Sequence, residues 1–132
     1  NSYLGLAISV VNHTDIKKFL CSIQKINSKI MGLIAGASGG DLGDLNFKNE
    51  ISELESMIQS FSKFDPPQAF SFSGSTLPGA ALDICRVFAR KVERRSVTYL
   101  RENPLVDSGI IAFYNRLSSL FYVLRLFVDQ PV

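Results

Sequence analysis

The sequence predicts an all-α fold: an antiparallel bundle of four to five helices that forms a single domain over residues 1–132. Apolar residues recur at steps of three and four along most of the chain, and Gly- or Pro-rich stretches separate these runs. A hydrophobic content of 46% with 20% charged residues is typical of a globular domain that has a substantial core. The sequence contains no internal repeat and no second block of different composition.

The first half of the chain predicts three helices. Residues 2–11 are apolar and predict the end of a helix, and the turn at 12–15 predicts a cap for the next one. Apolar residues then follow helical spacing from Ile16 to Ile34, with lysines on the opposite side, until the Gly-rich stretch 36–43 ends the helix. Asn49 is predicted to cap a third helix.

The second half predicts two more helices. The Pro- and Ser-rich stretch 62–77 indicates a loop or an extended segment. Pro78 suits the first turn of a helix that continues to about residue 101. Asn103-Pro104 breaks this helix, and Ser108 is predicted to cap a last helix that ends near residue 128.

The fourth predicted helix carries an unusual row of charges. Because a helix turns 100° per residue, Arg86, Arg90, Glu93 and Arg94 share one stripe roughly 100° wide, which we call the basic stripe. The opposite side is expected to face the core and holds Ala81, Ile84, Cys85, Phe88, Val92 and Tyr99. Like charges one turn apart are mildly destabilising. The stripe is therefore either a solvated face with pairs along the helix, or a site for an anion such as phosphate.

Two further sets of residues leave alternatives open. On the last helix, Asn115, Ser118, Ser119 and Tyr122 share one face. This face is either an ordinary polar surface, or Asn115 and Arg116 face the same pocket as the basic stripe. Phe70 and Phe72 lie in the polar stretch before the fourth helix, where they either fold back into the core or line a site for a large flat ligand.

Several functional classes are excluded by composition. The net charge of +2 is too small for general nucleic-acid binding, and no run reaches the roughly 18 uncharged apolar residues of a membrane span. Cys21 and Cys85 fit no zinc or redox motif and are expected to be buried thiols in a reducing, cytoplasmic setting. His13 is expected to be exposed and has no triad context. The Gly-rich stretch 39–43 lacks the strand and the ending of a phosphate loop.

The order and spacing of several motifs is specific. The chain presents an aromatic residue, a short Gly/Ser turn, a helix with two arginines four apart followed by Glu-Arg, and a later Asn-Arg-Leu-Ser. In this sequence the motifs are Phe70, Ser73-Gly74-Ser75, Ala81-Leu82, Arg86-Val-Phe-Ala-Arg90-Lys91-Val-Glu93-Arg94 and Asn115-Arg116-Leu117-Ser118. In this arrangement the chain resembles the PduO-type ATP:cob(I)alamin adenosyltransferases. The similarity extends over nearly the whole chain, and residues 1–7 resemble the end of that family's D-E-L-N-S segment.

The resemblance implies a fold and a reaction. It implies a homotrimer of ferritin-like, cobalamin adenosyltransferase-like five-helix bundles with active sites between subunits. It also implies transfer of the 5′-deoxyadenosyl group of ATP to cob(I)alamin, which gives adenosylcobalamin and triphosphate, with Mg²⁺ beside the ATP. Two alternatives are a non-catalytic bundle that binds ATP or a corrinoid, and a structural helical protein that uses the stripe for protein contacts.

The resemblance also implies roles for individual residues. Arg90 is expected to bind the triphosphate, with Glu93 and Arg94 in the environment of ATP and Mg²⁺. Asn115 and Arg116 are expected to contact the nucleotide from the last helix. Arg86 is expected to pair with an aspartate of the neighbouring subunit. Phe70 and Phe72 are expected to face the cobalamin; Phe70 would shield the lower face of the corrin and join Arg90 and Glu93 as catalytic residues.

The chain departs from the family pattern at three places. The family's T-x-x-G-D-x-G-x-T nucleotide loop and an acidic residue are expected to precede Asn1. Ser73 stands where proline is usual, and Ser119 replaces an aspartate that commonly follows N-R-L-S.

Overall fold

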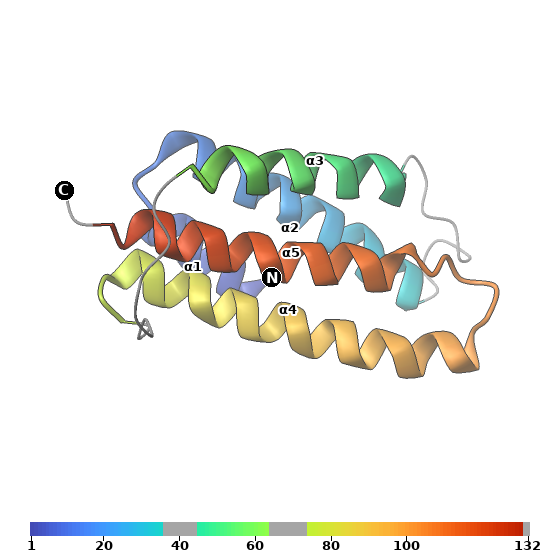
Figure 1. The fold of residues 1–132 in the computed structure, drawn as a ribbon. Coiled ribbons are helices and arrows are strands. Elements are labelled where there is room, and N and C mark those ends of the chain that lie inside the picture. Colours follow the sequence, from blue (N-terminus) through green and yellow to red (C-terminus); the bar gives the residue numbers. More distant parts are fainter. Residues whose placement is uncertain (36–44, 64–73, 131–132) are drawn as a thin grey trace.

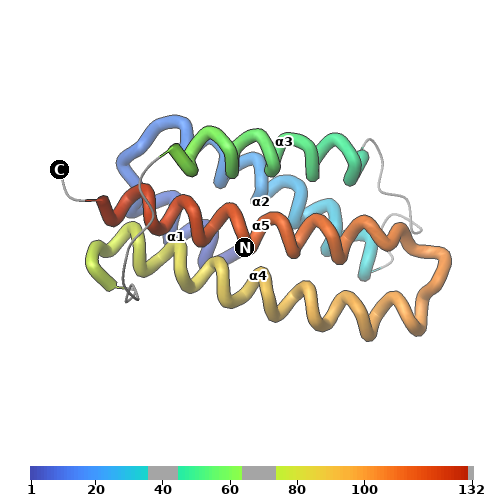
Figure 2. Tube along the Cα trace, in the orientation of Figure 1, coloured from blue at the N-terminus to red at the C-terminus, as the bar shows by residue number. Residues whose placement is uncertain are grey.

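The structure is a bundle of five helices. A computed structural model describes residues 1–35, 45–63 and 74–130, and these residues form helices connected by turns. The helices are α1 (Ser2–Val10), α2 (Thr14–Ile34), α3 (Phe47–Phe61), α4 (Leu77–Glu102) and α5 (Gly109–Val128). In Figures 1 and 2, α5 lies between α3 and α4, while α1 and α2 pack behind them. The predicted all-α antiparallel bundle is confirmed.

Side chains cap most helix starts, although one cap lies elsewhere than predicted. The side-chain oxygen of Asn46 accepts hydrogen bonds from the backbone N–H groups of Lys48 and Asn49, so the cap of α3 lies three residues before the predicted cap at Asn49. The earlier start buries Phe47. Thr76 caps α4, and Pro78 lies in its first turn as predicted.

The turn before α2 is packed more closely than the sequence indicated. The Nδ1 atom of His13 accepts a hydrogen bond from the backbone N–H of Ile16, 3.4 Å away, so His13 itself caps the helix. Its ring meets the rings of Phe61 and Phe127 edge-on, with centroids 5.7 and 5.5 Å away. The prediction that His13 is exposed is therefore wrong: the imidazole is half-buried between the ends of α3 and α5.

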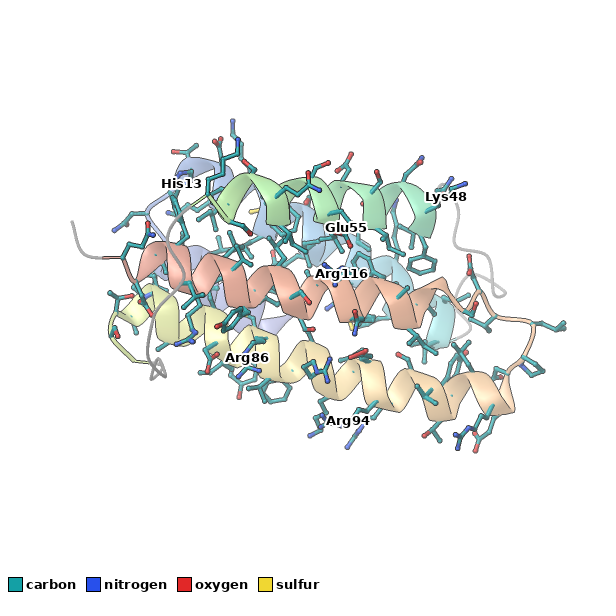
Figure 3. All side chains as sticks on the ribbon, in the orientation of Figure 1. His13, Lys48, Glu55, Arg86, Arg94 and Arg116 are labelled. Atoms are coloured by element: carbon teal, nitrogen blue, oxygen red, sulfur yellow. The ribbon has the colours of Figure 1, made fainter. Side chains whose placement is uncertain are left out.

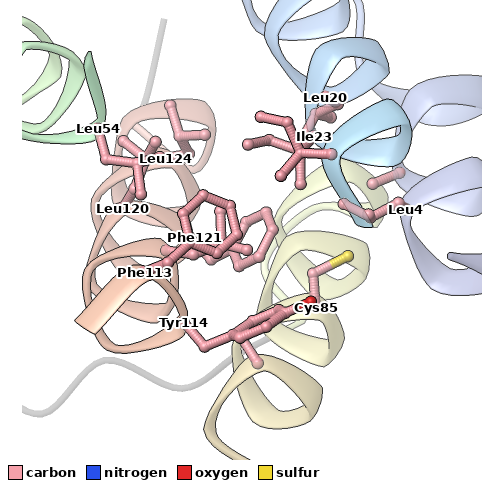
Figure 4. Close-up of a cluster of buried hydrophobic side chains, with 14 of the residues drawn as sticks. Leu4, Leu20, Ile23, Leu54, Cys85, Phe113, Tyr114, Leu120, Phe121 and Leu124 are labelled. Carbon is pink, nitrogen blue, oxygen red and sulfur yellow. The ribbon is translucent and has the colours of Figure 1, made fainter. Parts of the chain in front are cut away.

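Helix α5 supplies the centre of the hydrophobic core. Its buried side chains include Phe113, Leu120, Phe121 and Leu124, which pack toward α2, α3 and α4 (Figure 4). By length and composition alone α5 is apolar enough to cross a membrane, with a mean hydropathy of 1.2. Half of that span is buried inside the bundle, as expected for the core helix of a globular domain.

The buried face of α4 differs from the predicted one. Ala81 and Cys85 are buried as expected, but Ile84, Phe88 and Val92 are each more than one third exposed. The residues buried instead are Leu82, Ala89 and Ser96. The core-facing side is thus rotated by roughly 50° around the helix, toward the basic stripe. The small Ala89 and Ser96 allow a close approach to α5, whereas the larger apolar side chains remain on the surface.

The first turn of α4 and the end of α5 meet in a polar contact. The hydroxyl of Thr76 donates a hydrogen bond to Oδ1 of Asp129, 2.5 Å away, and accepts one from the backbone N–H of Gly79. The Asp129 carboxylate lies directly against the buried Gly79, and a Cβ at that position would collide with it. A carboxylate at the start of a helix is also favoured by the helix dipole.

We therefore expect Gly79→Ala to destabilise the protein by about 1–3 kcal/mol, because the added methyl group must displace a carboxylate that is held in place. Gly32→Ala is the matched control, since a Cβ at Gly32 of α2 meets nothing within 4 Å. The control should leave stability unchanged or raise it slightly. Chemical denaturation of both variants measures the difference, and equal stabilities would contradict the close contact.

Candidate functional site

The basic stripe and the last helix meet at Glu93. One carboxylate oxygen of Glu93 lies 3.1 Å from the Nη1 atom of Arg90, one turn away on α4. The other oxygen accepts a hydrogen bond of 2.9 Å from the side-chain amide of Asn115 on α5. The Glu93 side chain is 15% exposed, whereas that of Arg90 is 50% exposed. Glu93 therefore joins the two helices and holds the half-exposed Arg90 beside their contact.

Local structure on both helices positions these groups. The hydroxyl of Ser96 donates to the carbonyl of Val92, 2.8 Å away, which satisfies this buried side chain within α4. On α5, the hydroxyls of Ser118 and Ser119 both donate to the carbonyl of Asn115. The side-chain amide of Asn115 thus points toward α4 from a helix segment whose nearby polar groups are satisfied.

Arg86 lies about two turns away from Glu93 on the same helix. Its Nε atom donates to Oδ1 of Asp83 over 2.9 Å. The same carboxylate oxygen lies 3.6 Å from the Nε atom of Arg125 on α5. The side chain of Arg86 is 35% exposed and that of Arg125 only 5%. Arg86 therefore lies at the surface with a carboxylate of its own chain already beside it.

Arg94 is exposed and extends from α4 away from α5 (Figure 3). It has no ion-pair partner among residues 1–35, 45–63 and 74–130. Arg94 and the half-exposed Arg90 are one turn apart, so two guanidinium groups are presented on one side of α4. Such an arrangement favours an anion with several oxygens, because guanidinium groups bind phosphate through paired hydrogen bonds.

Arg116 faces a different neighbour from the one predicted. Two guanidinium nitrogens of Arg116 contact the carboxylate of Glu55 on α3. Nε lies against Oε1, and Nη2 donates a hydrogen bond to Oε2 over 3.4 Å. Figure 3 shows this pair between α3 and α5. The prediction that Arg116 shares the pocket of the basic stripe is corrected here. Adjacent residues on a helix point 100° apart, so an α5 that directs Asn115 at α4 directs Arg116 at α3.

A small cavity of about 140 Å³ lies between α1, α2, α4 and α5, and none of the predicted site residues that the structure describes lines it. Its lining includes Asn1, Asn27, Cys85, Val92 and Tyr114. The hydroxyl of Tyr114 donates to Oδ1 of Asn27, and the Nδ2 atom of Asn27 donates to Asn1 over 2.9 Å. These bonds tie the start of α1 to α2 and α5 at the level of the site.

The cysteines do not provide a nucleophile at this site. Burial raises the pKa of the Cys85 thiol to about 11, so the reactive thiolate is scarce near neutral pH. Burial also raises the pKa of the Tyr114 hydroxyl. Cys21 was expected to be buried, but it is exposed on the outer side of α2. Both thiols are free.

The described residues set limits on metal binding. In the part of the chain that the structure describes, no group of three or more His, Cys, Asp or Glu side chains is placed to hold a metal ion. Mg²⁺ does not need such a group, because it is usually held by one or two carboxylates together with phosphate oxygens and water. Glu93 is the carboxylate that fits this requirement beside the two arginines.

Other predicted and observed features lie outside this site. Phe70 and Phe72 fall outside the described residues. A larger, open hollow of about 720 Å³ lies where the first turns of α3 and α5 meet, and it contains none of the predicted site residues. Asp83, Glu55 and Arg125 were not predicted as partners. Asp83 lies three residues before Arg86, and Arg125 interrupts an apolar run, so the sequence did contain a signal for two of them.

Because Arg116 pairs with Glu55, its replacement should affect packing and not the site. We expect Arg116→Met to change the free energy of unfolding by less than about 1 kcal/mol, since this half-exposed pair is screened by solvent. The resemblance implies ATP binding, and calorimetry should then give the variant the same ATP affinity as the unaltered protein. A large loss of ATP affinity with unchanged stability would show that Arg116 turns toward the stripe after all.

Comparison with known proteins identifies the family of the chain. A family model described as cobalamin adenosyltransferase matches residues 1–128, which include all five helices, the basic stripe and Asn115. No curated protein matches the chain. A match over nearly the full length establishes the identity: the chain belongs to the cobalamin adenosyltransferase family, whose reaction transfers an adenosyl group to cobalamin.

Proposed function

We propose that the protein transfers the 5′-deoxyadenosyl group of ATP to cob(I)alamin and releases triphosphate. The observation that carries this proposal is the convergence on Glu93, which contacts Arg90 on one helix and Asn115 on another, 22 residues further along the chain. A solvated row of charges needs no such link to α5. The link supports a site with defined geometry where α4 and α5 meet.

The chemistry suits a site without a protein nucleophile. Reduced cobalt is itself the nucleophile that attacks the 5′ carbon of ATP, so the protein has to align the two substrates and stabilise charge on the departing triphosphate. Arg90 and Arg94 present permanent positive charge for this anion. Glu93 fixes Arg90 by an ion pair and is the residue that would share a Mg²⁺ ion with the phosphate oxygens.

The remaining roles complete the proposal. Asn115 contacts the nucleotide from α5 while it stays bonded to Glu93. Phe70 and Phe72 fall outside the described residues; the resemblance assigns them to the corrin, with Phe70 as the residue that would shield its lower face. Arg86 lies at the boundary with the neighbouring subunit. The free thiols suit a reducing compartment, and the proposal places the protein in the cytoplasm.

An exposed apolar surface supports assembly into a trimer. It consists of Tyr3 and Leu6 on α1 together with Ile84, Val87, Phe88 and Val92 on α4, and we call it the apolar face. The rings of Tyr3 and Phe88 stack with centroids 4.6 Å apart, so the two helices form one continuous surface. Contiguous exposed apolar side chains mark interaction sites. Because this face borders the basic stripe, a second copy bound here would bring its own residues to the site.

The reaction is tested by measuring adenosyl transfer by the Arg90→Ala variant of the naturally expressed protein. Arg90 is half exposed, so the variant should fold normally while adenosylation of cob(I)alamin, followed by absorbance, falls by about 100-fold or more. Lys18→Ala removes an exposed positive charge on α2, outside both the basic stripe and the apolar face, and should retain full activity. Equal activity of the two variants would exclude Arg90 from the site, and an inactive unaltered protein would exclude the proposed reaction.

The test of assembly is Phe88→Glu. A charge at the centre of the apolar face should convert the proposed trimer to monomers in light scattering, because a buried unpaired carboxylate is costly. Leu105→Glu is the control, since Leu105 is fully exposed in the turn between α4 and α5. Trimers that persist in Phe88→Glu would show that assembly uses another surface.

A further inference from the structure

Asp83 occupies an unusual position between two arginines. Its Oδ1 atom lies 2.9 Å from the Nε atom of Arg86 and 3.6 Å from the Nε atom of Arg125. The three side chains form a gradient of exposure, from 35% for Arg86 through 18% for Asp83 to 5% for Arg125. One carboxylate thus links an arginine at the surface to an arginine in the interior.

The buried arginine holds Asp83 in place. The Nε and Nη1 atoms of Arg125 are buried and have no hydrogen-bond partner among the described residues. The guanidinium carbon lies 5.6 Å from the centre of the Tyr122 ring, which covers it. A buried cation is strongly unfavourable without a compensating charge, and the Asp83 carboxylate is the one within ion-pair distance. Asp83 therefore cannot turn away without leaving Arg125 unpaired.

The held carboxylate in turn fixes Arg86. An arginine side chain has many rotamers, and an exposed one loses entropy when a partner must order it. Asp83 binds the Nε atom of Arg86, so the two terminal nitrogens stay available on the outer side of the guanidinium. The cluster holds two positive charges and one negative charge, so it retains attraction for a further anion.

We propose that Asp83 is a positioning residue for Arg86: anchored by buried Arg125, it pre-orders the Arg86 guanidinium to receive an acidic group of the neighbouring subunit. This inference rests on the proposed function for the presence of that neighbour. In this role Asp83 touches neither the substrates nor the neighbouring subunit, but it sets the strength of the subunit contact through Arg86.

The test separates positioning from folding by removing the buried charge as well. Asp83→Asn alone would leave Arg125 unpaired and reduce stability. The double variant Asp83→Asn/Arg125→Met replaces the buried pair by uncharged groups, which is often neutral for folding, and should regain a thermal midpoint close to that of the unaltered protein. Glu102→Gln, which neutralises an exposed carboxylate on the same helix, is the control.

The decisive measurement is the dissociation constant of self-association, obtained by sedimentation of the protein as it is naturally expressed. We expect about a tenfold rise for the double variant and for Arg86→Ala, and no further rise when all three changes are combined, because Asp83 acts through Arg86. The control should not change. Three outcomes would overturn the proposal. The double variant could fold and keep the dissociation constant of the unaltered protein, or the triple variant could show a further rise in that constant. The third outcome is an unaltered protein that does not self-associate.

Adenosyl transfer by the same variants distinguishes this proposal from the function on which it rests. Weaker self-association of the double variant in a protein without transferase activity would support the role of Asp83 and refute the reaction. Normal association with normal activity would refute the role of Asp83 alone.

Discussion

The close contact between α4 and α5 is the constraint on which the rest of the structure depends. Small buried residues on α4, Ala89 and Ser96, allow this approach, and the core side chains of α5 fill the space beside them. Three polar pairs then form across this contact. Asn115 reaches Glu93, Arg125 reaches Asp83, and Asp129 reaches Thr76. The site is therefore a product of helix packing and not of any single motif.

This dependence divides the residues of α4 into three functional sides. One side is buried against α5, a second presents arginines to solvent, and a third exposes the apolar face. Glu93 lies at the border between the first two sides, where partial burial strengthens its ion pair with Arg90. Arg86 lies on the side that presents arginines, where it pairs with Asp83. The proposed nucleotide site follows this division, because Arg90 and Arg94 lie on the side that presents arginines and Glu93 lies at its border.

Much of the fold could be predicted from the sequence because helical periodicity and capping residues act locally. The spacing of Arg90, Glu93 and Asn115 also indicated a site, and the structure brings these three together. Errors arose where distant partners decide the outcome. Ile84, Phe88 and Val92 are apolar and helical in spacing, yet the rotation that exposes them is set by the contact with α5. Arg116 adjoins Asn115 in sequence, but Glu55 of α3 lies where its side chain points.

The polar pairs between α4 and α5 have a consequence for how the bundle reaches a single structure. Asp83 and Glu93 are ten residues apart, as are their partners Asn115 and Arg125, so both pairs form in one register of the two antiparallel helices. A slip of α5 by one turn, about 5.4 Å, would leave the buried charge of Arg125 without a partner. The same slip would break the hydrogen bond between Asn115 and Glu93. Apolar side chains tolerate such a slip far better. The polar pairs therefore favour one register of α5 against α4, whereas the hydrophobic core alone would leave several registers close in free energy.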